Sequence, residues 1–240
     1  MKAPRPSRGQ KKWKTRPSPP PPPRRPAPPT RPATPDRPSA ALLIVISAPS
    51  GAGKTTLVNR LLRAQPRMVR VITCTTRPPR PGERDGVDYH FLTAADFLKR
   101  VQAGNFVEHA TVFGNSYGIL KSDLLDPLRA GQDVLLNIDV QGAATVRTQA
   151  ANDPELHRAL VTIFLTTTSI SVLAERLKKR GADTAAVMEK RLAVARHEVS
   201  QWRNFDYLLI SGTPQEDVRR ALVILEAEKM RSSRAAAPEL

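Results

Sequence analysis

The sequence predicts an α/β fold in which a mostly parallel sheet is flanked by helices. A continuously apolar run at 41–46 is typical of a parallel strand covered on both faces. Further apolar runs follow at 68–72, 134–138, 160–165 and 207–210. Helical patterns lie between these runs, and strands that alternate with helices indicate a parallel sheet core.

The first 40 residues differ from the rest in composition. They hold 14 of the 23 prolines and 11 of the 38 lysines and arginines, against the single acid Asp36. Such a segment cannot bury enough apolar surface to offset the entropy lost on ordering. We therefore predict a disordered, basic, proline-rich arm over 1–40 and one folded domain over 41–240.

The charge of the arm raises the question of polyanionic partners, because dense lysine and arginine attract nucleic acids. Trp13 is its only aromatic residue, so we expect weak polyanion binding and no specific nucleic-acid partner. The arm lacks the apolar core of a signal peptide, and no later stretch is apolar for long enough to cross a bilayer. The single cysteine, Cys74, fits a reducing compartment. We expect a cytoplasmic protein without a membrane partner.

Helix signals accompany the apolar runs. One helix is predicted from 55 to 64, ending before Pro66. Ser169 begins another, and Thr213-Pro214 followed by Glu216 resembles a capping box with proline at the first helical position.

The pattern changes between 75 and 125. Short β-like pieces at 89–92 and 106–108 flank a helix predicted over 93–103, which Gly104 terminates. This pattern indicates a small α+β insertion.

The insertion divides the core into 41–74 and 126–240. A second insertion, at 176–191, combines a helix, a turn at Gly181 and another helix start at Thr184, with six basic side chains. It indicates a helical lid.

A glycine-rich loop directly follows the first apolar run. Backbone N–H groups of such a loop converge on phosphate oxygens, and the next helix adds the positive end of its dipole. Lys54 would reach the β- and γ-phosphates, and the Thr55 hydroxyl would ligate Mg²⁺. Ala48 stands where the usual motif has its first glycine. With Mg²⁺ as the accompanying cofactor, the predicted ATP-binding residues are Ala48, Pro49, Ser50, Gly51, Ala52, Gly53, Lys54, Thr55 and Thr56.

A second candidate phosphate site lies about twenty residues later. Arg77 and Arg80 are three apart in a proline-stiffened loop, so their guanidinium groups can grip one phosphate at a low ordering cost. The alternative is a solvated basic turn. Two phosphate sites together indicate phosphoryl transfer between nucleotides.

The run at 75–91, TTRPPRPGERDGVDYHF, resembles the signature of guanylate kinases position for position. The resemblance covers about 42–229 and continues through 106–110, 113–118, 138–143 and 176–181. It implies a P-loop nucleoside monophosphate kinase fold with a GMP-binding insertion and a lid. It also implies an enzyme that phosphorylates GMP, and dGMP, with ATP in purine nucleotide metabolism and GMP recycling.

The same resemblance implies roles for individual residues. Arg77, Arg80, Tyr89 and Tyr117 would hold the GMP phosphate, and Thr73 and Glu108 would read the guanine. Guanine offers N1–H and its amine to one carboxylate, whereas adenine has an acceptor at N1, so this pairing can reject the wrong base. The remaining implied residues are Glu83 and Asp139 in the GMP site, and Lys54, Arg176, Arg180 and Arg191 as catalytic residues.

Three departures from the family pattern stand near the inferred ligands. Asn137 replaces an acid, Ile119 replaces a hydroxyl residue, and Ser211-Gly212-Thr213 replaces an asparagine followed by acids. We expect guanine selectivity and the adenine contacts to be the parts of the site that these residues alter. Cys74 replaces a small polar residue, and we expect it to be a buried side chain.

The expected mechanism follows from charge. The acceptor phosphate is already anionic near neutral pH, so catalysis needs in-line positioning and charge cancellation rather than a general base. The alternatives are a related kinase acting on a phosphorylated sugar, a non-catalytic interaction module, and a nucleic-acid binder acting through the arm. Lys54, Thr55, Arg180 and Arg191 argue against the interaction module.

Overall fold

A computed structural model describes residues 40–112, 114–179 and 185–235. These residues belong to one compact unit. The predicted arm, apart from residue 40, lies outside the described residues, as do the predicted lid turn at Gly181 and the catalytic candidate Arg180.

The core is a five-stranded sheet in the order β2-β7-β1-β8-β9, and every neighbouring pair is parallel. The central strand β1 pairs on both sides, so that Ile46 lies opposite both Asn137 and Ile163. The predicted parallel sheet is confirmed, although the run at 68–72 supplies only a two-residue edge strand. The strands are β1 (Leu43–Ser47), β2 (Val69–Arg70), β7 (Val134–Asn137), β8 (Leu160–Thr166) and β9 (Tyr207–Ile210).

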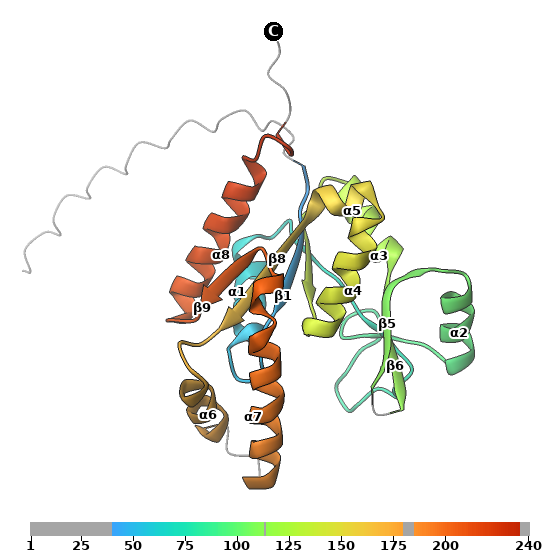
Figure 1. Ribbon diagram of the computed structural model, residues 1–240. Coiled ribbons are helices and arrows are strands. Elements are labelled where there is room, and N and C mark those ends of the chain that lie inside the picture. The colour runs from blue at the N-terminus through green and yellow to red at the C-terminus, as the bar shows by residue number, and fades with distance from the viewer. Residues whose placement is uncertain (1–39, 113, 180–184, 236–240) are drawn as a thin grey trace, which may run out of the picture. The chain divides into compact units, whose positions relative to one another are not determined.

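Helices cover both faces of this sheet, and the side chains of β1 alternate between them. Ile44 and Ile46 pack with α1 (Lys54–Ala64) and α8 (Pro214–Lys229), together with residues of α6 (Ile170–Lys179) and α7 (Ala185–Ser200). Leu43 and Val45 pack with α3 (Lys121–Arg129), α4 (Val140–Ala151) and α5 (Pro154–Ala159). Figure 1 shows α1 and α8 on one side of the sheet and α4 and α5 on the other. Burial on both faces explains why the first strand is apolar at each position from Leu43 to Ile46.

A second, four-stranded sheet has the order β4-β3-β6-β5. Only β3 and β4 run parallel; the other pairs are antiparallel. Phe97 of the neighbouring helix α2 and Phe106 stack with ring centroids 4.6 Å apart over the buried Cys74. A Cβ atom on Gly118 would lie 2.8 Å from the Phe106 ring, so this strand needs a glycine there. The elements are β3 (Cys74–Thr75), β4 (His90–Phe91), α2 (Ala94–Gln102), β5 (Phe106–Val112) and β6 (Asn115–Leu120).

The helix ends agree with their sequence signals. The Thr93 side chain caps α2, and Gly104 beyond its end has a φ of 66°. Thr213 and Glu216 form the predicted capping box of α8. The Ser169 hydroxyl accepts a hydrogen bond from the Val172 N–H at 3.3 Å before α6. A short 3-10 helix, η1 (Trp202–Asn204), precedes β9.

Candidate functional site

The loop between β1 and α1 has the backbone shape of a phosphate-binding loop. Gly51 and Gly53 have φ angles of 91° and 104°, in the left-handed region that glycine adopts without a steric cost. A Cβ atom on Gly51 would also lie 3.1 Å from Leu177 Cγ. Gly53 is the N-cap of α1 and supplies no side-chain hydrogen bond, so the first N–H groups of this helix are left for a ligand.

Lys54 begins α1 and points across the end of the core sheet. Its ammonium group donates a 3.0 Å hydrogen bond to the carbonyl of Ile138, directly after β7. Burial lowers the pKa of Lys54, while the carboxylates of Asp139 and Glu198 act in the opposite direction. The cavity beside this ammonium group has a volume of about 300 Å³, and its lining includes Ser50, Thr55 and Glu198.

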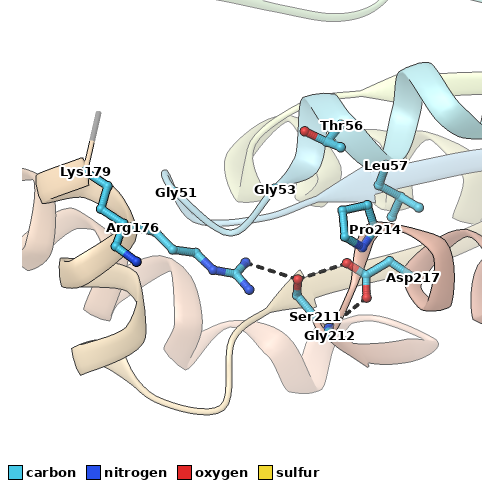
Figure 2. A pocket seen from close by; sticks show the side chains of 10 residues that line it. All are labelled: Gly51, Gly53, Thr56, Leu57, Arg176, Lys179, Ser211, Gly212, Pro214 and Asp217. Atoms are coloured by element: carbon cyan, nitrogen blue, oxygen red, sulfur yellow. Dashed lines mark hydrogen bonds between the residues drawn. The ribbon is translucent and has the colours of Figure 1, made fainter. Parts of the chain in front are cut away.

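Arg176 of α6 holds the other side of the same loop. Its Nη1 donates to the carbonyl oxygen of Ala52 at 3.2 Å and to the Ser211 hydroxyl at 3.1 Å. Asp217 of α8, only 6% exposed, accepts hydrogen bonds from the Ser211 hydroxyl and from the Gly212 N–H, both at 2.9 Å. Figure 2 shows the chain from Arg176 through Ser211 to Asp217.

These residues line a cavity of about 330 Å³, together with Thr56, Leu57, Lys179 and Pro214. The glycines of the phosphate loop border this cavity, and so does Ser211, which directly follows the edge strand β9. Asp217 is a residue that sequence reasoning missed. The sequence shows Asp217 only as an acid in the first turn of a helix. Such an acid is ordinarily explained by its favourable interaction with the helix dipole.

The arginine-rich loop is organised by Glu83. Nη2 of Arg77 donates to the two Glu83 carboxylate oxygens at 2.9 and 2.8 Å. The main-chain N–H of Arg80 donates to the same carboxylate at 2.8 Å. The Arg77 guanidinium also lies over the Tyr89 ring, 5.3 Å from its centroid. Glu83 therefore fixes the Arg77 guanidinium instead of leaving it as a solvated turn residue.

Two tyrosines complete this cluster. The rings of Tyr89 and Tyr117 meet edge to face with centroids 6.3 Å apart, and Arg77 also interacts with the Tyr117 hydroxyl. Tyr117 lies on β6, opposite Thr75 of β3. The structure thus brings together Arg77, Glu83, Tyr89 and Tyr117 from separate parts of the sequence, whereas Arg80 is exposed beside them.

Glu108 and Asp139 are two carboxylates from different parts of the fold. Glu108 lies on β5 at a shift in register opposite Ile119, and it is half-buried. Burial raises the pKa of Glu108 to about 7, and the negative charge of Asp139 adds to the shift. Asp139 is the N-cap of α4, where Oδ1 accepts from the N–H groups of Gln141 and Gly142 at 3.0 and 2.8 Å.

The remaining predicted positions are spread around this region. Thr73 is half-buried directly before β3, and its carbonyl accepts a 3.0 Å hydrogen bond from the His90 N–H. Ile119 is fully buried in the core. Asn137 ends β7, and its buried Oδ1 has no hydrogen-bond partner among the described residues. Arg191 is exposed on α7.

Cys74 is fully buried, as expected from the sequence. Burial raises the pKa of its thiol to about 11. A thiol with such a pKa is neutral near physiological pH, so Cys74 is a packing residue rather than a nucleophile.

Residues 40–227 match a family model described as guanylate kinase. The chain is 44% identical over 190 residues to a guanylate kinase of Coxiella burnetii, spanning 79% of this chain and 89% of the relative. It is 39% identical over 193 residues to a guanylate kinase of Maricaulis maris, spanning 80% and 86%. A crystal structure of guanylate kinase from Anaplasma phagocytophilum matches with a TM-score of 0.65 and 32% identity, covering 83% of this chain and 92% of that chain.

Proposed function

This chain belongs to the guanylate kinase family and acts on GMP as a nucleotide kinase, and on that premise we propose that ATP is its phosphoryl donor. The reaction converts ATP and GMP to ADP and GDP, and it extends to dGMP. We place this activity in cytoplasmic purine nucleotide metabolism and GMP recycling. None of the helices among the described residues is long and apolar enough to cross a membrane.

One observation carries the pairing of a donor site with an acceptor site. Asp139 is close enough to shift the pKa of Lys54 in the phosphate loop and also that of Glu108 on β5. A single carboxylate is therefore near both of the groups proposed to handle ATP phosphates and guanine. This proximity supports direct transfer between two bound nucleotides.

On the donor side, the loop amides and Lys54 hold the β- and γ-phosphates. The left-handed glycines aim successive N–H groups into one concave site, and α1 adds the positive end of its dipole. Charge that develops on the phosphates during transfer is stabilised by donors that are already oriented. We place the adenosine in the cavity of Arg176, Ser211 and Asp217.

The residues also suit Mg²⁺, the ion that accompanies ATP. The Thr55 hydroxyl lines the cavity beside Lys54, and an oxygen donor next to phosphate oxygens is the environment that Mg²⁺ prefers. When bound, Mg²⁺ neutralises phosphate charge and holds the triphosphate in one conformation.

On the acceptor side, Arg77 and Arg80 bind the GMP phosphate with the hydroxyls of Tyr89 and Tyr117. Glu83 orients Arg77, so little side-chain entropy is lost on binding. The acceptor oxygen is already anionic, so these groups position it in line and cancel charge without removing a proton.

Guanine is recognised by Glu108 and Thr73. The ionised Glu108 carboxylate accepts hydrogen bonds from N1–H and the exocyclic amine, and the Thr73 hydroxyl donates to O6. We assign Arg180 and Arg191 to the charge of the transferred phosphoryl group, together with Arg176. The N-terminal 40 residues are not required for this chemistry in our proposal and bind polyanions weakly.

A substrate panel tests the proposal. ADP release is measured with GMP, dGMP, AMP and a phosphorylated sugar as acceptors and Mg·ATP as donor. We expect turnover with GMP and dGMP, and selectivity over AMP of roughly 10⁴-fold. Turnover with the sugar phosphate but not with GMP would refute the acceptor assignment.

A further inference from the structure

The phosphate loop faces an acid of its own chain. Glu198, in the last turn of α7, lines the cavity beside Ser50, Lys54 and Thr55. The main-chain N–H of Ser50 donates a hydrogen bond to its carboxylate. Ser50 belongs to the loop whose amides are proposed to hold ATP phosphates, so one of those donors already has an anionic partner.

The charge of Glu198 is favoured by Lys54 and the Ser50 N–H on the side of the loop, and by the adjacent His197. The charged or titratable groups that act on Glu198 are Lys54 on α1, Asp139 at the start of α4, and the adjacent His197. Burial and the charge of Asp139 raise the pKa of Glu198, while Lys54 and the Ser50 N–H lower it. The carboxyl end of α7 also carries the negative end of a helix dipole, which disfavours an acid there. Lys54 and the loop N–H of Ser50 therefore stabilise the carboxylate more than His197 does.

A phosphate group needs the same contacts. Phosphate oxygens bind loop amides and the loop lysine because these donors carry partial or full positive charge. A carboxylate that uses one of these donors competes with phosphate and repels it in a partly buried cavity.

Resting on the proposed function, we propose that Glu198 occupies part of the ATP phosphate site in the nucleotide-free enzyme and must withdraw when ATP binds. Glu198 is thus a positioning residue that keeps the loop and Lys54 in their binding conformation but lowers the affinity for ATP. In the nucleotide-free enzyme, the Glu198 carboxylate occupies the position of a phosphate oxygen. The triphosphate displaces this carboxylate when ATP binds.

The exchange acts on a helix that also bears a proposed catalytic residue. Arg191 lies seven positions before Glu198, and residues two helical turns apart share a face. The fully buried Ala195 lies between them on that side and packs in the core. Withdrawal of the Glu198 side chain therefore takes place on the same side of α7 that presents Arg191.

The test compares Glu198→Gln with Glu189→Gln. Glutamine keeps the shape of the side chain and removes its charge. Glu189 is exposed on α7, nine positions before Glu198, which places it on the opposite face of the helix. Glu189→Gln therefore removes the same charge from α7, but away from the phosphate loop. Binding of Mg·ATP, inorganic tripolyphosphate and adenosine is measured by calorimetry, and the KM of each substrate is measured by ADP release.

We expect Glu198→Gln to bind Mg·ATP and tripolyphosphate about tenfold more tightly, because one close like charge is removed. Adenosine binding and the KM for GMP should stay unchanged, which a general structural effect would not produce. Glu198→Asp keeps the charge but shortens the side chain by one carbon, and it should give an intermediate gain. Glu189→Gln should match the wild type.

Equal or weaker binding of tripolyphosphate by a folded Glu198→Gln variant overturns the inference, and weaker binding would mean that Glu198 assists the nucleotide. A wild-type protein that binds neither Mg·ATP nor tripolyphosphate overturns the proposed function as well. The two failures are therefore distinguishable from the wild-type measurement alone.

Discussion

Lowering the pH from about 8 to about 6 should weaken GMP binding through one residue, Glu108. Burial raises the pKa of Glu108 to about 7. Guanine presents two donors, N1–H and the exocyclic amine, and only the ionised carboxylate accepts both. Protonated Glu108 must therefore lose its proton before guanine can pair with it.

The size of the effect follows from the ionised fraction. With a pKa of about 7, about nine tenths of Glu108 is ionised at pH 8 and about one tenth at pH 6. Apparent affinity scales with the fraction in the binding-competent state, so the GMP affinity should fall about tenfold between these pH values. Near pH 7, binding should release about half a proton from Glu108 per GMP bound.

Calorimetry measures both quantities when GMP is titrated in two buffers with different ionisation enthalpies. The GMP phosphate also titrates in this range, so Glu108→Gln provides the baseline because it retains every other titrating group. The difference between the wild type and this variant should show the tenfold change in GMP affinity and the release of about half a proton per GMP bound. Parallel pH profiles for the two proteins would refute the assignment of Glu108 to the guanine.

Base selectivity should change in the same direction. A protonated carboxyl, like the amide of Glu108→Gln, can donate to adenine N1 and accept from its amine. The preference for GMP over AMP should therefore shrink at low pH and in the variant. Selectivity that is unchanged in Glu108→Gln would count against direct base recognition.

The raised pKa also has a cost in stability. Because the folded-state pKa lies above the unfolded one, protonated Glu108 stabilises the fold at low pH, and this contribution is lost as pH rises from about 4 through 7. Since the side chain is only half-buried, we expect the loss to be about 1–2 kcal/mol. Glu108→Gln should recover it at pH 8, as a higher melting temperature.

Four further predictions concern other parts of the chain. Arg77→Ala should weaken GMP binding by about 100-fold, from the loss of charge-assisted hydrogen bonds, and leave guanosine binding unchanged in calorimetry; equal losses for both ligands would contradict a phosphate contact. Lys54→Ala should lower kcat by about 10²–10³ with GMP affinity nearly intact, and an equal loss of GMP affinity would argue against a donor-site role. Removal of residues 1–39 should leave kcat within about twofold in the ADP-release assay, whereas a collapse would show that the arm takes part in catalysis. Glu228 is 2% exposed and contacts Tyr207, Arg231 and Arg234, so Glu228→Ala should cost about 3–5 kcal/mol in urea unfolding; a loss below about 1 kcal/mol would mean that the buried arginine finds another partner.

The core of this fold was predictable because its central strands are buried on both faces. Apolar side chains dominate β1, β7, β8 and β9, so these strands stand out in the sequence, although Thr162 interrupts the run of β8 and Leu208 of the edge strand β9 is exposed. The second sheet gives a weaker signal. In β6, the segment NSYGIL mixes polar and apolar residues, and only Gly118 and Ile119 are buried. The two-residue β3 contains too few residues to show any periodicity.

The candidate site divides in the same way. The phosphate loop and the arginine loop are continuous in sequence, so their spacing reveals them. Asp217 and Glu198 lie on helices α8 and α7, where an acid ordinarily reads as a solvated or dipole-favoured residue. Only the fold places them against Ser211 and Ser50. Arg77 was found from its spacing and Glu83 was assigned to GMP by resemblance, while the contact between them was apparent only in three dimensions.

Three cations of the candidate site share one property: each is already held by an oxygen of the protein. Lys54 binds the Ile138 carbonyl, Arg77 binds the Glu83 carboxylate, and Arg176 binds the Ala52 carbonyl and the Ser211 hydroxyl. Preorganised cations need little reorganisation as charge develops during transfer. The same contacts offset the repulsion between these cations before nucleotides bind. A multiply charged phosphate can then add to each oxygen partner or replace it. Acids beside the phosphate sites, including Asp139 and Glu198, are therefore consistent with catalysis by charge, because they preserve the arrangement that ATP and GMP are proposed to occupy.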